Sequence, residues 1–387
     1  MNIIVYNGRV ITPDGIIYGG VSIHDGKIVK VFFGNTLEKS DLMINAHGNY
    51  ISPGFIDIHI HGGGGHDVSD CSKQGILQIC KAHAEFGTTS IVPTVTAAPM
   101  SDMIKAVETV KSAADGGHYG ANILGVHLEG PYLSPNQKDP KKAKHLRLPD
   151  KDEYMPLLNA WDKIKIMGSA PEFPGAYELA ELLHSRGIVA SIAHSDATFE
   201  EVETSLQYGF SDVTHIYSGC STMHRKEDHR YAGVVEAGLL LDKLTVQVLA
   251  DGKYLPIPFL RLLVKCKGYD RIALITNAIS LAASELTEGE TYVLKDGTEA
   301  VYSNGVMKLP DSHYFTGSVA TMNVLVRNMV KFAGVDVANA IKMASSTPAK
   351  IINEPNKGTI EYGKDADIII FDDEINVTEV IIGGDIF

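Results

Sequence analysis

The chain contains little of what marks secreted, membrane or nucleic-acid-binding proteins. Only four of its 387 residues are cysteines, and none stands in a Cys-x-x-Cys pair or a dense disulfide pattern. We therefore expect reduced thiols and a cytoplasmic location. No apolar run is long enough to cross a membrane, and no basic segment precedes an apolar one at the amino terminus. Neither a membrane span nor a secretory signal is expected.

Positive charge is also scarce. The chain has 34 Lys and Arg residues against 47 Asp and Glu, which gives a net charge of −13. This excess of negative charge argues against nucleic acids and anionic membranes as partners, although a local basic pocket can still hold a small phosphate. The hydrophobic fraction of 44% is typical of globular proteins. The length indicates several domains, or one large barrel with an accessory piece.

The two ends of the chain share a pattern of short strands and tight turns. Near the amino terminus, Asn7-Gly8 and Asp25-Gly26 separate apolar runs. Both pairs are expected to form hairpin turns, because a type I′ turn needs positive φ at both central residues. We expect residues 1–52 and 347–387 to pair into one small β-sandwich domain that is discontinuous in sequence.

Residues 53–346 alternate between strand-like and helical segments, which is the signature of βα units. The eight strand-like runs are 54–61, 88–94, 123–129, 164–170, 188–194, 212–217, 244–250 and 271–276, and helical stretches include 73–86, 103–114, 176–186 and 258–267. Eight such units predict an α/β fold, a closed (β/α)8 barrel of the TIM type. A doubly wound sheet is the alternative, but no G-x-G-x-x-G fingerprint follows the first strand.

The first strand-like run carries two histidines in a His-x-His pattern. Between Ile56 and His61, apolar residues alternate with polar ones, so His59 and His61 share one face of a strand. A run of four glycines follows, which lets backbone or substrate approach closely. Two imidazoles on one face are a ready pair of ligands for a divalent metal.

Other runs end in residues of the same kind, and barrel enzymes place their chemistry at the carboxyl ends of strands. The third run ends in Glu129, the fifth in His194, and the sixth reaches His215. Together with the His-x-His pair they predict a metal site at one rim of the barrel. Neutral imidazoles with a carboxylate suit zinc first, or iron or another first-row metal, as one or two ions.

Several motifs make the pattern more specific. They are His-x-His at 59–61, His-Leu-Glu-Gly-Pro at 127–131, Ala-Pro-Glu at 170–172, Ala-Asp-Gly at 250–252 and Gly-Lys-Asp-Ala-Asp at 363–367. Over nearly the whole chain they resemble the amidohydrolase superfamily, and within it the N-acetylglucosamine-6-phosphate deacetylases. The resemblance implies a metal-dependent hydrolase that cleaves the acetamide of an amino-sugar phosphate to an amine and acetate. It assigns the principal metal to Glu129, His194 and His215, and a second metal to His59 and His61.

The resemblance also bears on what joins two metals. Some members of the superfamily bridge them with a carbamylated lysine at the end of the fourth strand. Here that strand ends in Ser169-Ala170-Pro171-Glu172, and its lysines, Lys163 and Lys165, lie at its start. Glu129 is therefore the expected bridge.

One expected catalytic group is replaced. The resemblance implies an aspartate at the end of the eighth strand, which takes a proton from the attacking water and returns it to the leaving amine. Asn277 stands there, and because an amide cannot carry that proton near neutral pH, we expect a loss of about 10²–10⁴-fold. Three explanations are open: an engineered change that traps substrate, a natural relative that does not deacetylate, or an enzyme with another base. The complete ligand set favours the first.

The substrate pocket that the resemblance implies also departs from the family pattern. Its candidate residues are Lys141, Ser218, Gly219, Lys226, Tyr254, Phe315, Thr316 and Gly317. Lys226 aligns with a phosphate-binding arginine and keeps the charge without the bidentate fork. Tyr254 stands where a histidine is expected. In relatives a neighbouring subunit completes this pocket, which implies a homodimer.

Two further functions are therefore open beside the deacetylase. Ser218, Lys226 and Tyr254 favour an amidohydrolase for a different N-acyl amino sugar or an N-acyl amino acid. Asn277 favours a catalytically silent protein that binds a sugar phosphate. Acetate release from a panel of N-acetyl compounds distinguishes the three.

Overall fold

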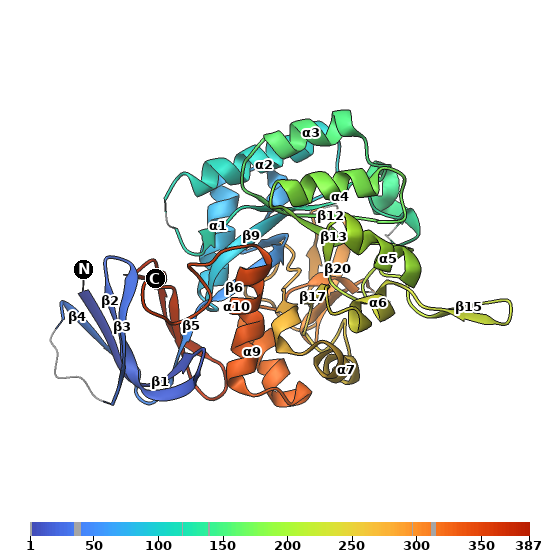
Figure 1. Cartoon of the computed structure of the whole chain (residues 1–387). Coiled ribbons are helices and arrows are strands. Elements are labelled where there is room, and N and C mark those ends of the chain that lie inside the picture. The colour runs from blue at the N-terminus through green and yellow to red at the C-terminus, as the bar shows by residue number, and fades with distance from the viewer. Residues whose placement is uncertain (1, 35–39, 118, 138–139, 296, 311–314) are drawn as a thin grey trace.

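The computed structural model describes residues 2–34, 40–117, 119–137, 140–295, 297–310 and 315–387, without the side chains of residues 140–142. Its centre is a ring of eight parallel strands (Figure 1), in the order β6 (Phe55–Ile60), β9 (Thr88–Thr96), β11 (Val126–Glu129), β12 (Ile164–Ser169), β13 (Val189–Ile192), β14 (Phe210–Val213), β17 (Thr245–Val248) and β18 (Ile272–Leu274). Each strand overlaps one of the runs predicted from the sequence. The largest difference is at β14, which begins two residues before its predicted run and ends four residues before that run does.

The ring is closed by backbone hydrogen bonds between the end of β6 and the segment that follows β18. The amide of Asn277 donates to the carbonyl of His59 at 2.9 Å, and the amide of His61 donates to the carbonyl of Ala278 at 2.9 Å. These bonds join the segment after β18 to β6, so the predicted closed barrel is confirmed and the open sheet is excluded. They also bring the His-x-His strand beside Asn277.

The third predicted strand is interrupted. Residues 122–123 form β10 (Asn122–Ile123), β11 begins at Val126, and both pair with β9. Gly125 lies in the gap with φ 154, and a Cβ there would come within 2.3 Å of the carbonyl oxygen of Lys163. The backbones just before β11 and just before β12 therefore approach too closely for a side chain at residue 125.

Helices pack around the outside of the ring (Figure 1). They are α1 (Lys73–Ala84), α2 (Met100–Ala114), α3 (Lys151–Asn159), α4 (Ala176–Ser185), α5 (Phe199–Ser205), α6 (Val234–Leu240), α7 (Ile257–Lys267), α8 (Met322–Asn328), α9 (Val337–Ala344) and α10 (Ser346–Ile351). The four predicted helices correspond to α1, α2, α4 and α7. One large apolar cluster fills the space between strands and helices. Among the described residues, no helix is long and apolar enough to cross a membrane.

Both chain ends contribute to a second sheet, as predicted. Its eight strands are β1 (Asn2–Thr12), β2 (Gly15–His24), β3 (Lys27–Phe33), β4 (Leu42–Asn45), β5 (Tyr50–Pro53), β23 (Ile368–Phe371), β24 (Val377–Ile382) and β25 (Asp385–Ile386). In its hydrogen bonding the expected sandwich is a single mixed sheet, with β4 and β5 parallel to β1 and β23 antiparallel to β5. The domain limits at 52 and 347 stay a prediction, and α10 packs against the barrel strands β6 and β18.

One of the two predicted turns in this sheet is wrong. Asp25 and Gly26 have φ of 45° and 74° and connect β2 to β3, as a type I′ turn requires. Asn7-Gly8 instead lies inside the continuous strand β1, at a shift in its register against β2. Only Asn7 has positive φ, at 59°, so the pair forms a bulge rather than a turn.

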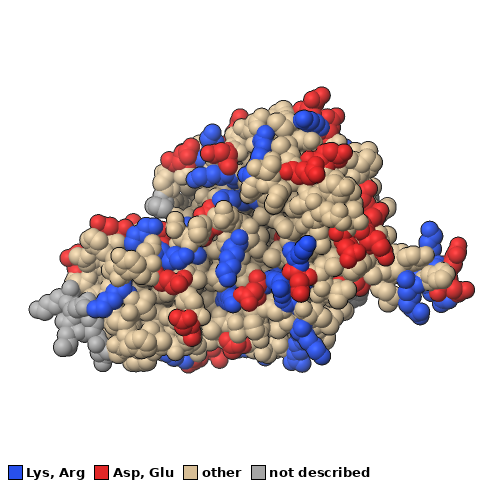
Figure 2. Space-filling model, viewed as in Figure 1, with Lys and Arg blue, Asp and Glu red and all other residues tan. Residues whose placement is uncertain are grey.

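Three smaller β elements of the described residues lie outside the ring and the chain-end sheet. A four-stranded antiparallel sheet comprises β19 (Thr291–Val293), β20 (Glu299–Ser303), β21 (Val306–Lys308) and β22 (Phe315–Ser318). A hairpin of β15 (His224–Lys226) and β16 (His229–Tyr231) projects away from the barrel, and Figure 2 shows basic and acidic side chains on it. A two-stranded sheet of β7 (Gly62–Gly63) and β8 (His66–Asp67) follows β6.

Candidate metal centre

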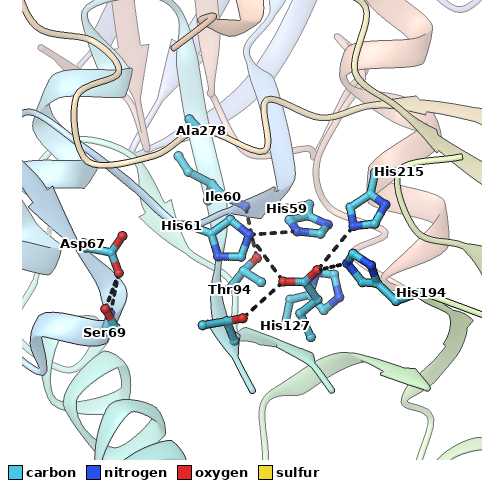
Figure 3. A network of polar contacts seen from close by, with 12 residues as sticks. His59, Ile60, His61, Asp67, Ser69, Thr94, His127, His194, His215 and Ala278 are labelled. Carbon is cyan, nitrogen blue, oxygen red and sulfur yellow. Dashed lines mark hydrogen bonds and ion pairs between the residues drawn. The ribbon is translucent and has the colours of Figure 1, made fainter. Parts of the chain in front are cut away.

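Five side chains of the predicted ligand set meet at the carboxyl end of the barrel (Figure 3). His59 and His61 come from the end of β6, and Glu129 is the last residue of β11. His194 and His215 each stand two residues beyond a strand, after β13 and β14. Residues separated by more than 150 positions thus converge because every parallel strand ends at the same rim.

Glu129 lies at the middle of this group. Its Oε1 is 2.7 Å from Nε2 of His194 and 3.3 Å from Nε2 of His215, while its Oε2 is 3.6 Å from Nε2 of His61. His61 Nε2 is in turn 3.2 Å from Nε2 of His59. Two sets of three ligand atoms, each within 4.8 Å of one another, result: His59, His61 and Glu129, and Glu129, His194 and His215. Glu129 belongs to both, the position expected of a bridging carboxylate.

Burial keeps part of the site neutral. His59 and His127 are fully buried within the barrel. Burial lowers the pKa of His127 to about 3, and burial together with the nearby His127 and His61 holds the pKa of His59 well below its usual range. A neutral imidazole has one lone pair that can bind a cation. The donor set, neutral imidazole with carboxylate, therefore fits a first-row divalent metal.

The backbone at the strand ends is unusual. His194, His215 and Asn277 have φ of 42°, 28° and 46°, in the left-handed region that non-glycine residues seldom occupy. Such conformations cost free energy and persist where the surrounding structure holds them, often at functional sites. Here all three occur just beyond the ends of barrel strands, at the rim where the ligand-type side chains meet.

Neighbouring residues fix the ring of His194. Its Nδ1 lies 2.7 Å from the carbonyl oxygen of Gln137, so Nδ1–H donates to that oxygen and Nε2 faces Glu129. The carboxylate of Asp196 accepts hydrogen bonds from Ser134, Asn136 and Gln137, at 2.5, 3.0 and 2.5 Å. Asp196 therefore holds the loop that carries the Gln137 carbonyl.

Gly219, a predicted substrate residue, packs against the same hydrogen bond. A Cβ at this position would come within 2.3 Å of Nδ1 of His194 and 2.8 Å of the carbonyl oxygen of Gln137. Its φ of 63° also favours glycine. Gly219 thus allows the close contact that orients His194.

A buried polar chain beneath His59 has no counterpart in the sequence-based prediction. Nδ1 of His59 lies 3.1 Å from Oε1 of Gln247, and Nε2 of Gln247 donates to Oδ2 of Asp212 at 2.8 Å. Burial raises the pKa of Asp212, and hydrogen bonds from Thr245, Ser191 and Gln247 oppose that rise. The available signal was a glutamine at an inward position of the apolar strand β17.

Asn277 occupies the end of the eighth strand, at the rim. The preceding Thr276 donates its hydroxyl hydrogen to Asp57, a fully buried carboxyl group one layer deeper in the barrel. Burial raises the pKa of Asp57 to about 7. The carboxyl group hydrogen-bonded to the residue before Asn277 is thus engaged within the barrel wall.

The other predicted substrate residues divide into two groups. The ring centroids of Tyr254 and Phe315 are 4.9 Å apart, and β22, which contains Phe315, Thr316 and Gly317, runs beside the segment after β18 through an Ala278–Ser318 bridge. Ser218 follows His215 and donates its amide hydrogen to the His215 carbonyl at 2.9 Å.

Lys226 is exposed on the hairpin that projects away from the barrel (Figure 1). The fold does not bring it to the five ligand-type side chains within one chain. The side chain of Lys141 lies outside the described residues. Lys165, at the start of β12 and so at the end of that strand away from the rim, pairs with Glu354 at 2.6 Å.

Comparison with known proteins places these features in context. The model of the amidohydrolase family matches residues 50–387. The chain is 30% identical to the N-acetylglucosamine-6-phosphate deacetylase of Homo sapiens, over 98% of this chain and 94% of that protein. It is also 30% identical to the N-acetylgalactosamine-6-phosphate deacetylase of Escherichia coli O157:H7, over 86% of each chain. The crystal structure of N-acetylglucosamine-6-phosphate deacetylase from Pasteurella multocida superimposes with a TM-score of 0.91, at 26% identity and with both chains fully covered.

Proposed function

The chain belongs to the amidohydrolase family, and we propose that it is a metal-dependent deacetylase that hydrolyses N-acetylglucosamine 6-phosphate to glucosamine 6-phosphate and acetate. The family is one of hydrolytic enzymes, and the similar proteins named above act on N-acetylated amino-sugar phosphates by their names. The observation that carries the proposal is the position of Glu129, shared by two sets of ligand atoms at the rim of the barrel.

Each residue of the centre has a stated part in this reaction. Glu129, His194 and His215 would hold the principal ion, and His59 and His61 with Glu129 a second one, with zinc the first candidate and iron or another first-row metal as alternatives. A bound divalent ion supplies an activated water and polarises the amide carbonyl. His59, whose pKa burial holds well below its usual range, would keep a lone pair for an ion.

With asparagine at position 277, we expect proton transfer to limit the rate of the reaction. The side-chain amide of Asn277 can orient a water or a carbonyl group but cannot take a proton from one and return it to the leaving amine. We therefore expect low turnover, reduced by about 10²–10⁴-fold relative to a chain with aspartate at this position.

The substrate end of the pocket supports an amino sugar more firmly than its phosphate. Tyr254 and Phe315 form an aromatic wall beside the segment after β18, a surface that suits the apolar face of a sugar ring. The hairpin with Arg225, Lys226 and Arg230 points away from its own barrel. We infer a homodimer in which this hairpin brings positive charge to the phosphate in the neighbouring subunit.

Two other functions have a specific observation in their favour. The tyrosine at 254 and the remote Lys226 favour an amidohydrolase for a different N-acyl amino sugar or an N-acyl amino acid. Asn277 favours a catalytically silent protein that binds a sugar phosphate. All three use the same barrel and the same ligand set.

Metal analysis combined with acetate release separates these functions. The purified protein is assayed with N-acetylglucosamine and N-acetylgalactosamine, each with and without a 6-phosphate, and with N-acetyl amino acids. Acetate release that depends on a bound metal and on the 6-phosphate supports the proposal. Release only from the other compounds supports the second function, and a metal-free protein without activity contradicts the proposal.

Replacement of Asn277 by aspartate tests the proton-transfer argument. We predict that Asn277→Asp raises kcat for acetate release by about 10²–10⁴-fold, because a carboxylate restores general acid–base catalysis. Metal content serves as the control, since it is expected to stay at the parental value. If the Asn277→Asp variant keeps its metal and gains no rate, the result favours the silent sugar-phosphate binder.

A further inference from the structure

The buried chain beneath His59 links three strands of the barrel. His59 lies on β6, Gln247 on β17 and Asp212 on β14, and none of the three side chains is exposed to solvent. The atoms join in sequence, with 3.1 Å from Nδ1 of His59 to Oε1 of Gln247 and 2.8 Å from Nε2 of Gln247 to Oδ2 of Asp212. A glutamine amide has a donor end and an acceptor end, so its orientation decides what His59 meets.

Asp212 sets that orientation. Its Oδ2 accepts a hydrogen bond from Ser191 at 2.8 Å as well as the one from Gln247, and its Oδ1 accepts from Thr245 at 2.6 Å. Ser191 donates its single hydroxyl hydrogen to Asp212. The hydroxyl of Thr214, 2.6 Å from that of Ser191, must therefore donate to Ser191. Every neighbour of the carboxylate is then a donor, which requires the amino group of Gln247 to face Asp212 and its carbonyl oxygen to face His59.

This orientation of Gln247 decides which nitrogen of the His59 ring carries the hydrogen. Oε1 of Gln247 can only accept, so Nδ1 of His59 carries the hydrogen, and in the neutral ring Nε2 keeps the lone pair. That lone pair points at Nε2 of His61, 3.2 Å away. Two ring nitrogens at this distance can share a proton or a cation, and a carboxylate oxygen of Glu129 lies 3.6 Å from the second nitrogen.

We propose that Gln247 and Asp212 are positioning residues that hold His59 in the Nδ1–H form, and so prepare the His59, His61 and Glu129 position for a divalent cation. Neither touches the reacting atoms. The inference rests on the metal centre proposed above and deepens it. It also predicts that a change at Gln247 weakens binding at only one of the two metal positions. His194, in the other position, is held in the same Nδ1–H form by the backbone carbonyl of Gln137.

Gln247→Leu tests the chain, with Thr245→Val as the matched control. The leucine keeps similar bulk and removes the acceptor of His59. The valine removes one donor to Asp212 and leaves the contact between Gln247 and His59. Removal of an outer partner of a ligating histidine typically weakens metal binding by 10- to 100-fold. With Zn²⁺ titrated into the metal-free full-length protein, we expect this loss for one of two ions in Gln247→Leu and parental binding of both in Thr245→Val.

A second measurement needs no variant beyond one for assignment. Nitrogen NMR shifts of histidine in the metal-free parent distinguish a hydrogen on Nδ1 from one on Nε2, and His59→Gln assigns the signal. Hydrogen on Nδ1 of His59 supports the proposal, and hydrogen on Nε2 overturns it. Parental binding of both ions by Gln247→Leu also overturns it, as does a parent that binds a single ion. A parent that binds no ion contradicts the proposed metal centre itself.

Discussion

Two polar clusters, each built on a buried carboxylate, join distant parts of this chain, and they differ in the partners of that carboxylate. At the rim of the barrel, Glu129 lies among imidazole rings, with Nε2 of His194 at 2.7 Å. Where the chain-end sheet meets the barrel, Nζ of Lys357 lies 2.5 Å from Asp367 and 3.0 Å from Asp365. Burial does not distinguish them, because Glu129 is 4% exposed and Asp367 7%.

The partners decide what each cluster can do. An ammonium group has three donors and no lone pair, so Lys357 can only neutralise the carboxylates beside it. Asp367 also accepts a hydrogen bond from the amide of Gly383 and another from Asn122, which ties the sheet to the barrel. A neutral imidazole can instead give a lone pair to a cation. The junction formed by Lys357, Asp365 and Asp367 is therefore suited to stabilising the fold, and the rim is suited to metal binding.

Glu129→Gln is the change with the largest expected effect on the rim. Both sets of ligand atoms contain Glu129, and each ion contributes several kcal/mol to the reaction. A loss of acetate release of about 10⁴-fold or more follows. Metal content by elemental analysis should fall for both ions, while urea denaturation of the metal-free protein stays close to that of the parent. Retention of two tightly bound ions would contradict the bridging role.

At the junction, Lys357→Met should lower stability and leave metal binding unchanged, the opposite of Glu129→Gln. Breaking a buried ion pair leaves unpaired charge, at a cost of about 3–5 kcal/mol, and the side chain of Lys357 is only 11% exposed. We expect this loss in the free energy of unfolding, measured with urea, and unchanged metal content. Lys27→Met, which removes a half-exposed partner of Asp365, serves as the control and should cost less than about 1 kcal/mol.

The barrel beside the rim and the junction should also lose stability in different ranges of pH. His83 is buried beside the glycine run after β6, where its Nε2 lies 3.0 Å from the carbonyl oxygen of Gly62, and burial lowers its pKa from 6.5 to about 4. Below pH 6.5 the unfolded chain binds a proton that the folded chain does not, so stability falls as the pH falls towards 4.

The junction responds only at lower pH. Hydrogen bonds from Lys27 and Lys357 hold the pKa of Asp365 below its ordinary value despite its burial. The stability that Asp365 contributes is therefore present above the pKa of this group in the unfolded chain, and it is lost only as the pH falls through the pKa in the folded chain.

Urea unfolding at pH 7 and pH 5 tests the response of His83. Between these two pH values we expect the free energy of unfolding of the parent to fall by about 2 kcal/mol more than that of His83→Gln, from roughly 1.36 kcal/mol per pH unit. Equal losses would show that His83 does not titrate as described.

Patterns within a few residues predicted much of this molecule. The alternation around His59 and His61, the run ending in Glu129 and the spacing of eight apolar segments are local features, and each strand of the barrel lies close to its predicted limits. Asn7-Gly8 failed as a turn because β1 continues through it, paired with β2 on one edge and with β4 and β5 on the other. Local turn preference is weak beside a strand that hydrogen-bonds on both edges.

The sequence by itself determined the barrel, the sheet built from both ends and the identity of the ligand-type residues, because these depend on periodicity and side-chain chemistry. Only the tertiary structure decided the distances between Glu129 and the imidazoles around it, that the hairpin with Lys226 points away from its own barrel, and that Gln247 stands between His59 and Asp212. The reason is physical. A contact between β6, β14 and β17 depends on how the ring of strands closes, and residues that are 188 positions apart, such as His59 and Gln247, carry no local signal of their meeting.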